Sequence, residues 1–146
     1  MGNICRSPTA EGVMRALLRE RGIADVEVES AGVGDWHVGH GPDERATEAA
    51  RRRGIVLEGK ARQVSPRDFA DFDLILAMDR QNLQDLRELA PDDAARAKVR
   101  LLREFDPASA GAPDLDVPDP YYGGPRGFET VLDQVEAACR GLLAEV

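Results

Sequence analysis

The sequence predicts an α/β fold with three layers, α/β/α, in which helices cover both faces of a short parallel sheet. Segments with the apolar pattern of strands alternate along the chain with segments whose apolar residues recur at helical spacing. Strands joined through helices pair in parallel, because the crossover between them is right-handed. With 146 residues, 42% of them hydrophobic, the chain has the size of one domain covering 1–146.

The first predicted helix starts at Ser7 and Pro8. Serine is a favoured N-cap, and proline suits the first helical position, where no N–H is required. Gly22 is a natural stop. One face of the predicted helix is apolar, formed by Ala10, Val13, Met14, Leu17 and Leu18.

The next predicted strand is 26–30, where apolar and charged residues alternate as in a strand near a sheet edge. The glycine-rich stretch 31–41 predicts a loop. A second helix is expected to open at Pro42 and to end near Gly54.

Two further strands and a long loop follow a short helical turn expected at Ser65. The continuous apolar run 74–77 predicts a strand buried on both faces, and 99–102 predicts a third strand. Asp79 is expected to cap the helix between these two strands, whose buried stripe is Leu83, Leu86 and Leu89. The proline-rich stretch 104–126 is a loop of a length that usually serves a function. The last helix has a broad apolar face, made of Phe128, Val131, Leu132, Val135, Ala138, Cys139, Leu142 and Leu143.

Charge and cysteine content exclude several classes of protein. A net charge of -8 argues against general binding of nucleic acid or of an anionic membrane, since both need a basic surface. No apolar run in the sequence is long enough to cross a bilayer, and the start lacks the pattern of a signal peptide. Cys5 and Cys139 do not indicate a disulfide framework, so we expect a reducing, cytoplasmic location. No metal-ligand spacing occurs, so His37 and His40 are expected to be loop residues and no cofactor is expected.

The first candidate for chemistry is the loop that leads into the first helix. Small and polar residues run from Gly2 to Ser7, and unpaired N–H groups at a helix start favour an anion. Arg6 adds a planar guanidinium that can bind two phosphate oxygens. The pattern fits a phosphate site, and it equally fits a capped helix with a surface arginine.

The second candidate is Asp119. Pro118 and Pro120 stiffen the backbone on both sides of this carboxylic acid, and Tyr121 and Tyr122 follow directly. By itself the stretch also fits a surface turn whose tyrosines pack against the fold.

The two motifs together resemble the low-molecular-weight protein tyrosine phosphatase family, over nearly the whole chain. The motifs are Gly2-Asn3-Ile4-Cys5-Arg6-Ser7-Pro8 and Asp119-Pro120-Tyr121-Tyr122-Gly123. The resemblance implies that Gly2, Asn3, Ile4, Cys5, Arg6 and Ser7 bind phosphate, with Arg6 and Asp119 as catalytic residues. It also implies that Trp36, Tyr121 and Tyr122 line the substrate cleft, that Ser30 braces the phosphate loop, and that Asp79 is a buried supporting carboxylate. Asp79 as a plain N-cap remains an equal interpretation, and Trp36 as an anchor of its own loop is another.

The resemblance also implies that part of the family pattern lies before Met1. Family members read Cys-x-x-x-x-x-Arg-Ser/Thr, so the nucleophilic cysteine would be the residue preceding Met1, and Cys5, next to Arg6, is no substitute. The family's first strand would lie inside a four-stranded sheet, between 26–30 and 74–77. We therefore expect that residues 1–146 alone, with three strands visible, fold poorly. Gly59 stands where many members have a histidine near Asn3.

The implied activity is hydrolysis of phosphotyrosine through a phosphocysteine, with a phosphotyrosine protein or a small aryl phosphate as substrate. No metal is needed, and a monomer or weak dimer is expected. One alternative is a phosphotyrosine-binding module without catalysis, since the residues present lack the nucleophile. Arsenate reductases and arginine phosphatases of the same fold are further alternatives. The Tyr121-Tyr122 pair and a buried Cys139 disfavour the first of these, and Ile4 disfavours the second.

Overall fold

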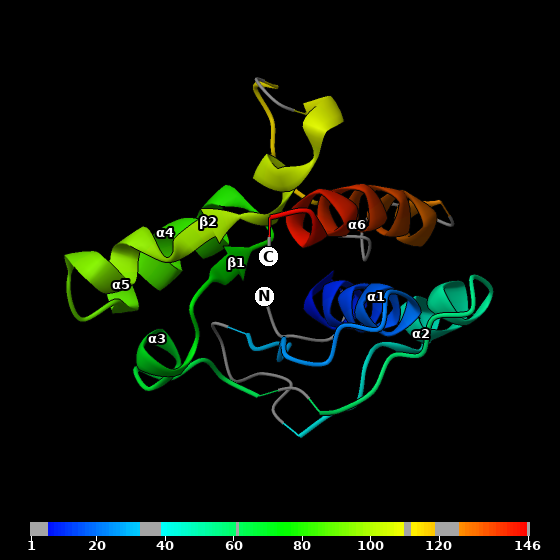
Figure 1. Cartoon of the computed structure of the whole chain (residues 1–146), viewed down its shortest axis with the longest axis horizontal. Helices are drawn as coiled ribbons and strands as arrows, with labels where there is room; N and C mark the ends of the chain where they lie inside the picture. Colours follow the sequence, from blue (N-terminus) through cyan, green and yellow to red (C-terminus); the bar gives the residue numbers. More distant parts are fainter. Residues whose placement is uncertain (1–5, 33–38, 61, 110–111, 119–125, 146) are drawn as a thin grey trace.

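A computed structural model describes residues 6–32, 39–60, 62–109, 112–118 and 126–145 (Figure 1). The helices in these ranges are α1 (Arg6–Glu20), α2 (Glu44–Arg51), α3 (Asp68–Asp71), α4 (Arg80–Leu89), α5 (Asp93–Ala97) and α6 (Gly127–Leu143). Two strands, β1 (Ile75–Ala77) and β2 (Val99–Leu101), and two 3-10 turns, η1 (Leu102–Phe105) and η2 (Pro107–Ser109), complete the described elements.

The strands β1 and β2 pair in parallel, with Ile75 opposite Val99 and Ala77 opposite Leu101. The chain between them forms α4 and α5, so the predicted crossover through helical segments is confirmed. Both strands fall inside the predicted ranges 74–77 and 99–102, and each loses one predicted residue.

Alternation along the strands produces the predicted layers. Ile75 and Ala77 point to the same face of the sheet as Val99 and Leu101, where they pack with residues of α4 and α5. Leu74 and Leu76, of the opposite parity, and Leu102 pack against α1 and α6, whereas Arg100 of β2 is exposed. The short sheet therefore lies between two helical layers, and Figure 1 shows α1 beside α6 and apart from α4 and α5.

The prediction of a strand at 26–30 is wrong, because the structure assigns no strand to these residues. Among the described residues, the bridge in this region joins Gly32 to Gln63, through Gly32 N–H to Arg62 O and Val64 N–H to Gly32 O, both 2.8 Å. A strand requires a neighbour that offers backbone hydrogen bonds, and no described segment offers them to 26–30. Val26 and Val28 nevertheless pack partly buried against the core, so the alternating pattern was correct about burial.

Three details of the helices also differ from the prediction. The helix α1 already includes Arg6 and Ser7, so Ser7 is not the N-cap and lies in the first turn instead. The helix α2 starts at Glu44, because the carboxylate of Asp43 accepts the N–H groups of Arg45 and Ala46 and caps it. In α4, Leu86 is buried as predicted, whereas Leu89 is 47% exposed at the end of the helix.

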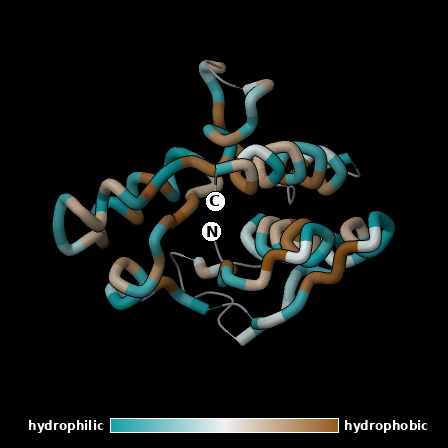
Figure 2. The backbone as a smooth tube through the Cα atoms, in the orientation of Figure 1, coloured by the Kyte–Doolittle hydropathy of each residue, from teal (hydrophilic) through white to brown (hydrophobic). Residues whose placement is uncertain are grey.

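The helices α1 and α6 form the main body of the core, and all eight predicted apolar residues of α6 are buried. Gly141 allows α6 to approach η1, since a Cβ at this position would lie 1.7 Å from the carbonyl oxygen of Phe105. Figure 2 shows the hydrophobic colouring of β1 and the hydrophilic turn between α4 and α5. None of the described helices has the length and apolar character needed to cross a bilayer.

Candidate active site

Arg6, the first residue of α1, is buried to 6% exposure and reaches across the sheet edge to two acceptors. Its Nη1 donates to Oδ2 of Asp79 at 2.7 Å and to the carbonyl oxygen of Val117 at 2.8 Å. Among the described residues, both bonds use this one nitrogen, so they orient the guanidinium without occupying its Nε and Nη2. A guanidinium fixed in this way can present its remaining N–H groups to a phosphoryl oxygen.

Asp79 directly follows β1 and Met78 and serves two purposes at once. Its Oδ1 accepts the N–H of Asn82 at 2.7 Å and caps α4, as the sequence predicts. Its Oδ2 binds Arg6. Burial raises the pKa of Asp79, but the Asn82 N–H and the Arg6 guanidinium outweigh burial, and the pKa lies below its ordinary value. The two interpretations of Asp79, cap and supporting carboxylate of Arg6, therefore both hold.

The segment 113–118, called here the loop base, connects this ion pair to the second motif. The N–H of Val117 donates to Met78 O at 2.7 Å, and the Val117 carbonyl accepts from Arg6. The Val117 side chain is completely buried. Asp119 follows Val117 by only two residues in the sequence. The backbone bond between Arg6 and Val117 therefore lies two residues before the expected general acid.

The family of the chain follows from its matches with known proteins. The profile of the family described as low molecular weight phosphotyrosine protein phosphatase matches residues 1–146. A low molecular weight protein-tyrosine-phosphatase of Streptomyces coelicolor is 53% identical over 146 residues, covering 99% of this chain and 88% of the relative.

The chain belongs to the low molecular weight phosphotyrosine protein phosphatase family.

A pig member of the family, a low molecular weight phosphotyrosine protein phosphatase, is 44% identical over 148 residues, covering 100% of this chain and 91% of the relative. Among solved structures, a protein tyrosine phosphatase of Entamoeba histolytica superposes with a TM-score of 0.91 at 35% identity. That match covers 99% of this chain and 91% of the other. The predicted α/β fold is thus the fold of the low molecular weight phosphatases.

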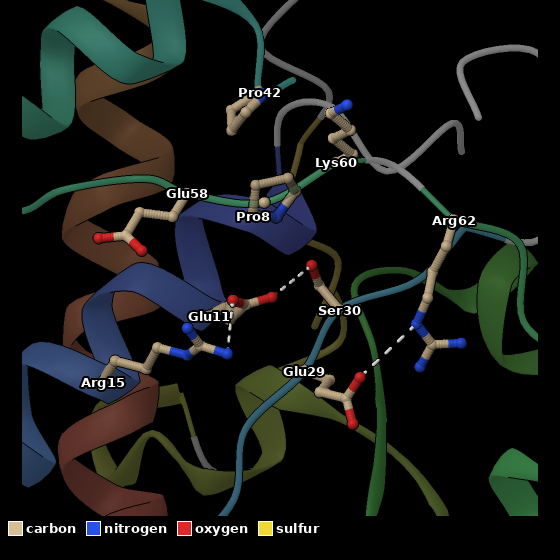
Figure 3. Close-up of a pocket in the computed structure, with 10 residues that line it drawn as sticks. Pro8, Glu11, Arg15, Glu29, Ser30, Pro42, Glu58, Lys60 and Arg62 are labelled. Carbon is tan, nitrogen blue, oxygen red and sulfur yellow. Dashed lines mark hydrogen bonds and ion pairs between the residues drawn. The ribbon is translucent and has the colours of Figure 1, made fainter. Parts of the chain in front are cut away.

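Ser30 is expected to brace the phosphate loop of this phosphatase, whose residues 2–5 lie outside the described residues, and its described partner lies on α1. Its hydroxyl donates to Oε1 of Glu11 at 2.7 Å, and Glu11 also pairs with Arg15 at 3.1 Å (Figure 3). Ser30 and Gly59 lie on the wall of a pocket of about 240 Å³. A Cβ added to Gly59 would meet nothing within 4 Å, although its φ of +87° favours glycine.

The charges around this pocket cancel. Its lining includes three acidic side chains, Glu11, Glu29 and Glu58, and three basic ones, Arg15, Lys60 and Arg62. Such a lining creates no net attraction for a phosphate. The lining of the pocket in Figure 3 therefore gives no reason to expect phosphate there, and phosphate binding by Arg6 stays a prediction.

Several predicted site residues lie outside the described residues, and the structure neither places nor contradicts them. They are Gly2, Asn3, Ile4, Cys5, Trp36, Asp119, Tyr121 and Tyr122. Ser7 is described as a half-buried residue in the first turn of α1. The structure thus brings together Arg6, Asp79 and the loop base, and leaves Ser30 with Glu11.

Sequence reasoning missed three residues that hold the loop base, namely Arg80, Arg103 and Asp116. The N–H of Arg80 donates to Oδ1 of Asp116 at 2.9 Å, and Arg103 Nη1 donates to the Asp116 carbonyl at 2.7 Å. The available signal was the position of Asp116, three residues before the expected general acid, and an arginine directly after the predicted strand 99–102.

Cys139 has the environment of an inert core residue. It is 1% exposed, and burial, with Glu136 nearby, raises the pKa of its thiol to about 12. The thiolate needed for nucleophilic attack or for an electron relay is therefore strongly disfavoured. In the described part of the chain, no group of three or more His, Cys, Asp and Glu side chains could hold a metal ion.

Proposed function

We propose that this phosphatase hydrolyses phosphotyrosine in proteins, or small aryl phosphates, through a phosphocysteine intermediate. The observation that supports the proposal best is the position of the Arg6 guanidinium. It is buried and held between Asp79 and the Val117 carbonyl, two residues before the proposed acid Asp119. A cationic group fixed beside the start of an acid loop is what phosphoryl transfer needs, because catalysis there depends on positioning and on stabilisation of the oxygens' charge.

In the first step, a cysteine thiolate attacks phosphorus, an S–P bond forms and the P–O bond to the phenol breaks. Arg6, with Gly2, Asn3, Ile4, Cys5 and Ser7 as the remaining phosphate loop, binds the equatorial oxygens. Asp119 gives its proton to the departing phenolate oxygen, so that a neutral phenol leaves. Trp36, Tyr121 and Tyr122 would contact the phenyl ring.

In the second step, water attacks the phosphocysteine, the S–P bond breaks, and inorganic phosphate and the thiolate are released. Asp119, now ionised, accepts the proton of the attacking water. The thiolate that both steps require fits the reducing cytoplasm, which we propose as the location.

The family spacing Cys-x-x-x-x-x-Arg implies a nucleophilic cysteine six positions ahead of Arg6, and this expectation can be tested. The decisive experiment compares residues 1–146 with an extended chain, defined as residues 1–146 preceded by an apolar strand that ends in cysteine. We expect the extended chain to hydrolyse phosphotyrosine peptides and to be inhibited by vanadate. Its variant with serine in place of the added cysteine should be inactive.

The outcome that would refute the enzyme interpretation is equally specific. If the extended chain bound phosphotyrosine peptides without releasing phosphate, the binding module would replace the phosphatase. Hydrolysis by residues 1–146 alone, at a rate equal to that of the extended chain, would show that the nucleophile is assigned wrongly. Trapping of phosphate on the added cysteine, measured by mass spectrometry after acid quench, identifies the intermediate directly.

A further inference from the structure

The loop base is held more tightly than a surface loop requires. Besides the two bonds of Val117, the Asp116 carbonyl accepts from Arg103 and its carboxylate accepts from the N–H of Arg80. Arg80 Nη2 also donates to the carbonyl of Pro113 at 3.0 Å. The loop base is therefore fixed from both of its ends before the chain reaches Asp119.

Arg103 is the unusual member of this set. It lies in η1, directly after β2, and its Nη2 donates to the hydroxyl of Ser109 at 3.3 Å. That hydroxyl donates in turn to Oδ2 of Asp106 at 2.8 Å, and both Ser109 and Asp106 are only 8% exposed. A buried relay thus fixes the guanidinium so that its Nη1 reaches the Asp116 carbonyl.

The Nε of Arg103 argues against a purely structural explanation. This nitrogen is buried, and no described residue offers it an acceptor. A buried N–H without a partner costs stability, and such groups in native proteins call for a specific reason. A lysine or an apolar side chain would avoid this cost, but neither would make a planar two-nitrogen contact with both Ser109 and Asp116.

We propose that Arg103 is a positioning residue for the general acid, because it fixes the 116–117 peptide from which Asp119 extends. This inference rests on the proposed function. Its effect falls on proton transfer to the leaving group, since an acid must reach the departing oxygen within hydrogen-bond distance. Phosphate binding is affected much less, because Arg6 keeps its bond to Asp79 when the loop base shifts.

The test uses the extended chain and measures kcat/KM for aryl phosphates whose phenols differ in acidity. Poor leaving groups need the proton and acidic phenols do not. In Arg103→Met we expect a loss of roughly tenfold for phenyl phosphate and less than about twofold for the most acidic phenol. Arg103→Lys, which keeps one donor for the Asp116 carbonyl but cannot also contact Ser109, should recover only part of the loss. The inhibition constant of inorganic phosphate should change less than about twofold, since Asp79 still holds Arg6.

Arg87→Met is the matched control. Like Arg103, Arg87 donates to a backbone carbonyl, but its Nη2 bonds Val99 of β2 at 3.2 Å and not the loop base. The control should leave the dependence on phenol acidity unchanged. Ser109→Ala, which removes only the hydroxyl that holds Nη2, should show a smaller change in the same direction and serves if Arg103→Met fails to fold.

An equal loss for every leaving group in Arg103→Met and Ser109→Ala would overturn the inference, and so would a weakened phosphate inhibition constant with unchanged leaving-group dependence. Failure of the proposed function gives a different result, because the unsubstituted extended chain would then release no phosphate from any substrate.

Discussion

Arg6 Nη1 lies 2.7 Å from Oδ2 of Asp79, so that the first residue of α1 is joined to the N-cap of α4. Arg6 is 6% exposed and Asp79 19% exposed, and the ion pair is therefore largely shielded from water. Asp79 stands beyond the carboxyl end of β1, at the edge of the sheet where open α/β folds bind their ligands. The pair thus places a guanidinium at that edge, and its two bonds to described residues, Asp79 and Val117, both use Nη1.

Asp79→Asn is expected to destabilise the protein by about 2–4 kcal/mol, because it leaves the buried Arg6 charge without its counter-ion. The amide oxygen of asparagine can still accept the Asn82 N–H, so the cap of α4 is retained and the loss reports the ion pair. Urea unfolding of the extended chain measures it. Asp93→Asn, which removes a fully exposed partner of Arg96, is the control and should leave the midpoint unchanged. Equal midpoints for both variants would contradict the prediction.

The loss of stability in acid should depend on the carboxylates that pair with arginine, Asp79 and Asp68. The pKa values of Asp79 and Asp68 lie below the ordinary range, because hydrogen bonds and arginine partners outweigh their burial. The unfolded chain then binds protons first, near pH 4, so the stabilisation is complete above about pH 4 and is lost as the pH falls through the native pKa values. Urea midpoints between pH 3 and pH 7 should therefore drop at the acid end. Asp79→Asn should flatten that drop, and parallel curves for the two proteins would refute the assignment.

The sequence predicted what depends on local chemistry. Burial and capping depend on residues close together in the sequence. For that reason the sequence predicted the strand at 74–77, the cap at Asp79 and the apolar face of the last helix. The pattern around Arg6 equally fitted a surface arginine, and the structure shows that Arg6 is buried and bonded to Asp79.

The rest depends on contacts between distant segments. The stretch 26–30 has a strand pattern, but pairing needs a neighbouring strand, and the pattern contains no information about one. Arg103 and Asp116 are thirteen positions apart, and only the path of the backbone through η1 and η2 brings the guanidinium to that carbonyl. The bond of Ser30 to Glu11 could not be predicted from spacing either, and whether Ser30 also braces residues 2–5, which lie outside the described residues, stays a prediction.

Cys139 should be unreactive in the folded protein. Its thiol is 1% exposed, and burial raises its pKa to about 12, so almost no thiolate exists at neutral pH. We expect iodoacetamide to modify the added nucleophile of the extended chain rapidly and Cys139 only at the rate of unfolding, as followed by peptide mass spectrometry. Urea should remove the difference. Fast modification of Cys139 in the native state would contradict this prediction and would favour the alternative of an arsenate reductase, which relays electrons through reactive cysteines.

Two helical glycines allow a graded test of the packing that holds α1 and α6 in place. A Cβ at Gly141 would lie 1.7 Å from the carbonyl oxygen of Phe105, and backbone there cannot move without displacing η1, which carries Arg103. A Cβ at Gly12 would lie 2.6 Å from Cδ2 of Leu57, the flexible end of a side chain, and 3.1 Å from the Val56 carbonyl oxygen, a much milder backbone contact than at Gly141. Alanine is favoured over glycine in a helix by about 1 kcal/mol, which partly offsets each clash.

We therefore expect Gly141→Ala to lower the free energy of unfolding by at least about 2 kcal/mol and Gly12→Ala to change it by less than about 1 kcal/mol. Gly141→Ala should also lower kcat/KM for phenyl phosphate more than for acidic phenols, because the displaced η1 carries Arg103 away from the Asp116 carbonyl. Urea unfolding and the leaving-group series measure the two effects on the same samples. Equal stability of the two variants would mean that α6 can move away from η1 without cost. A stability loss in Gly141→Ala without a leaving-group effect would mean that the position of η1 does not influence the general acid.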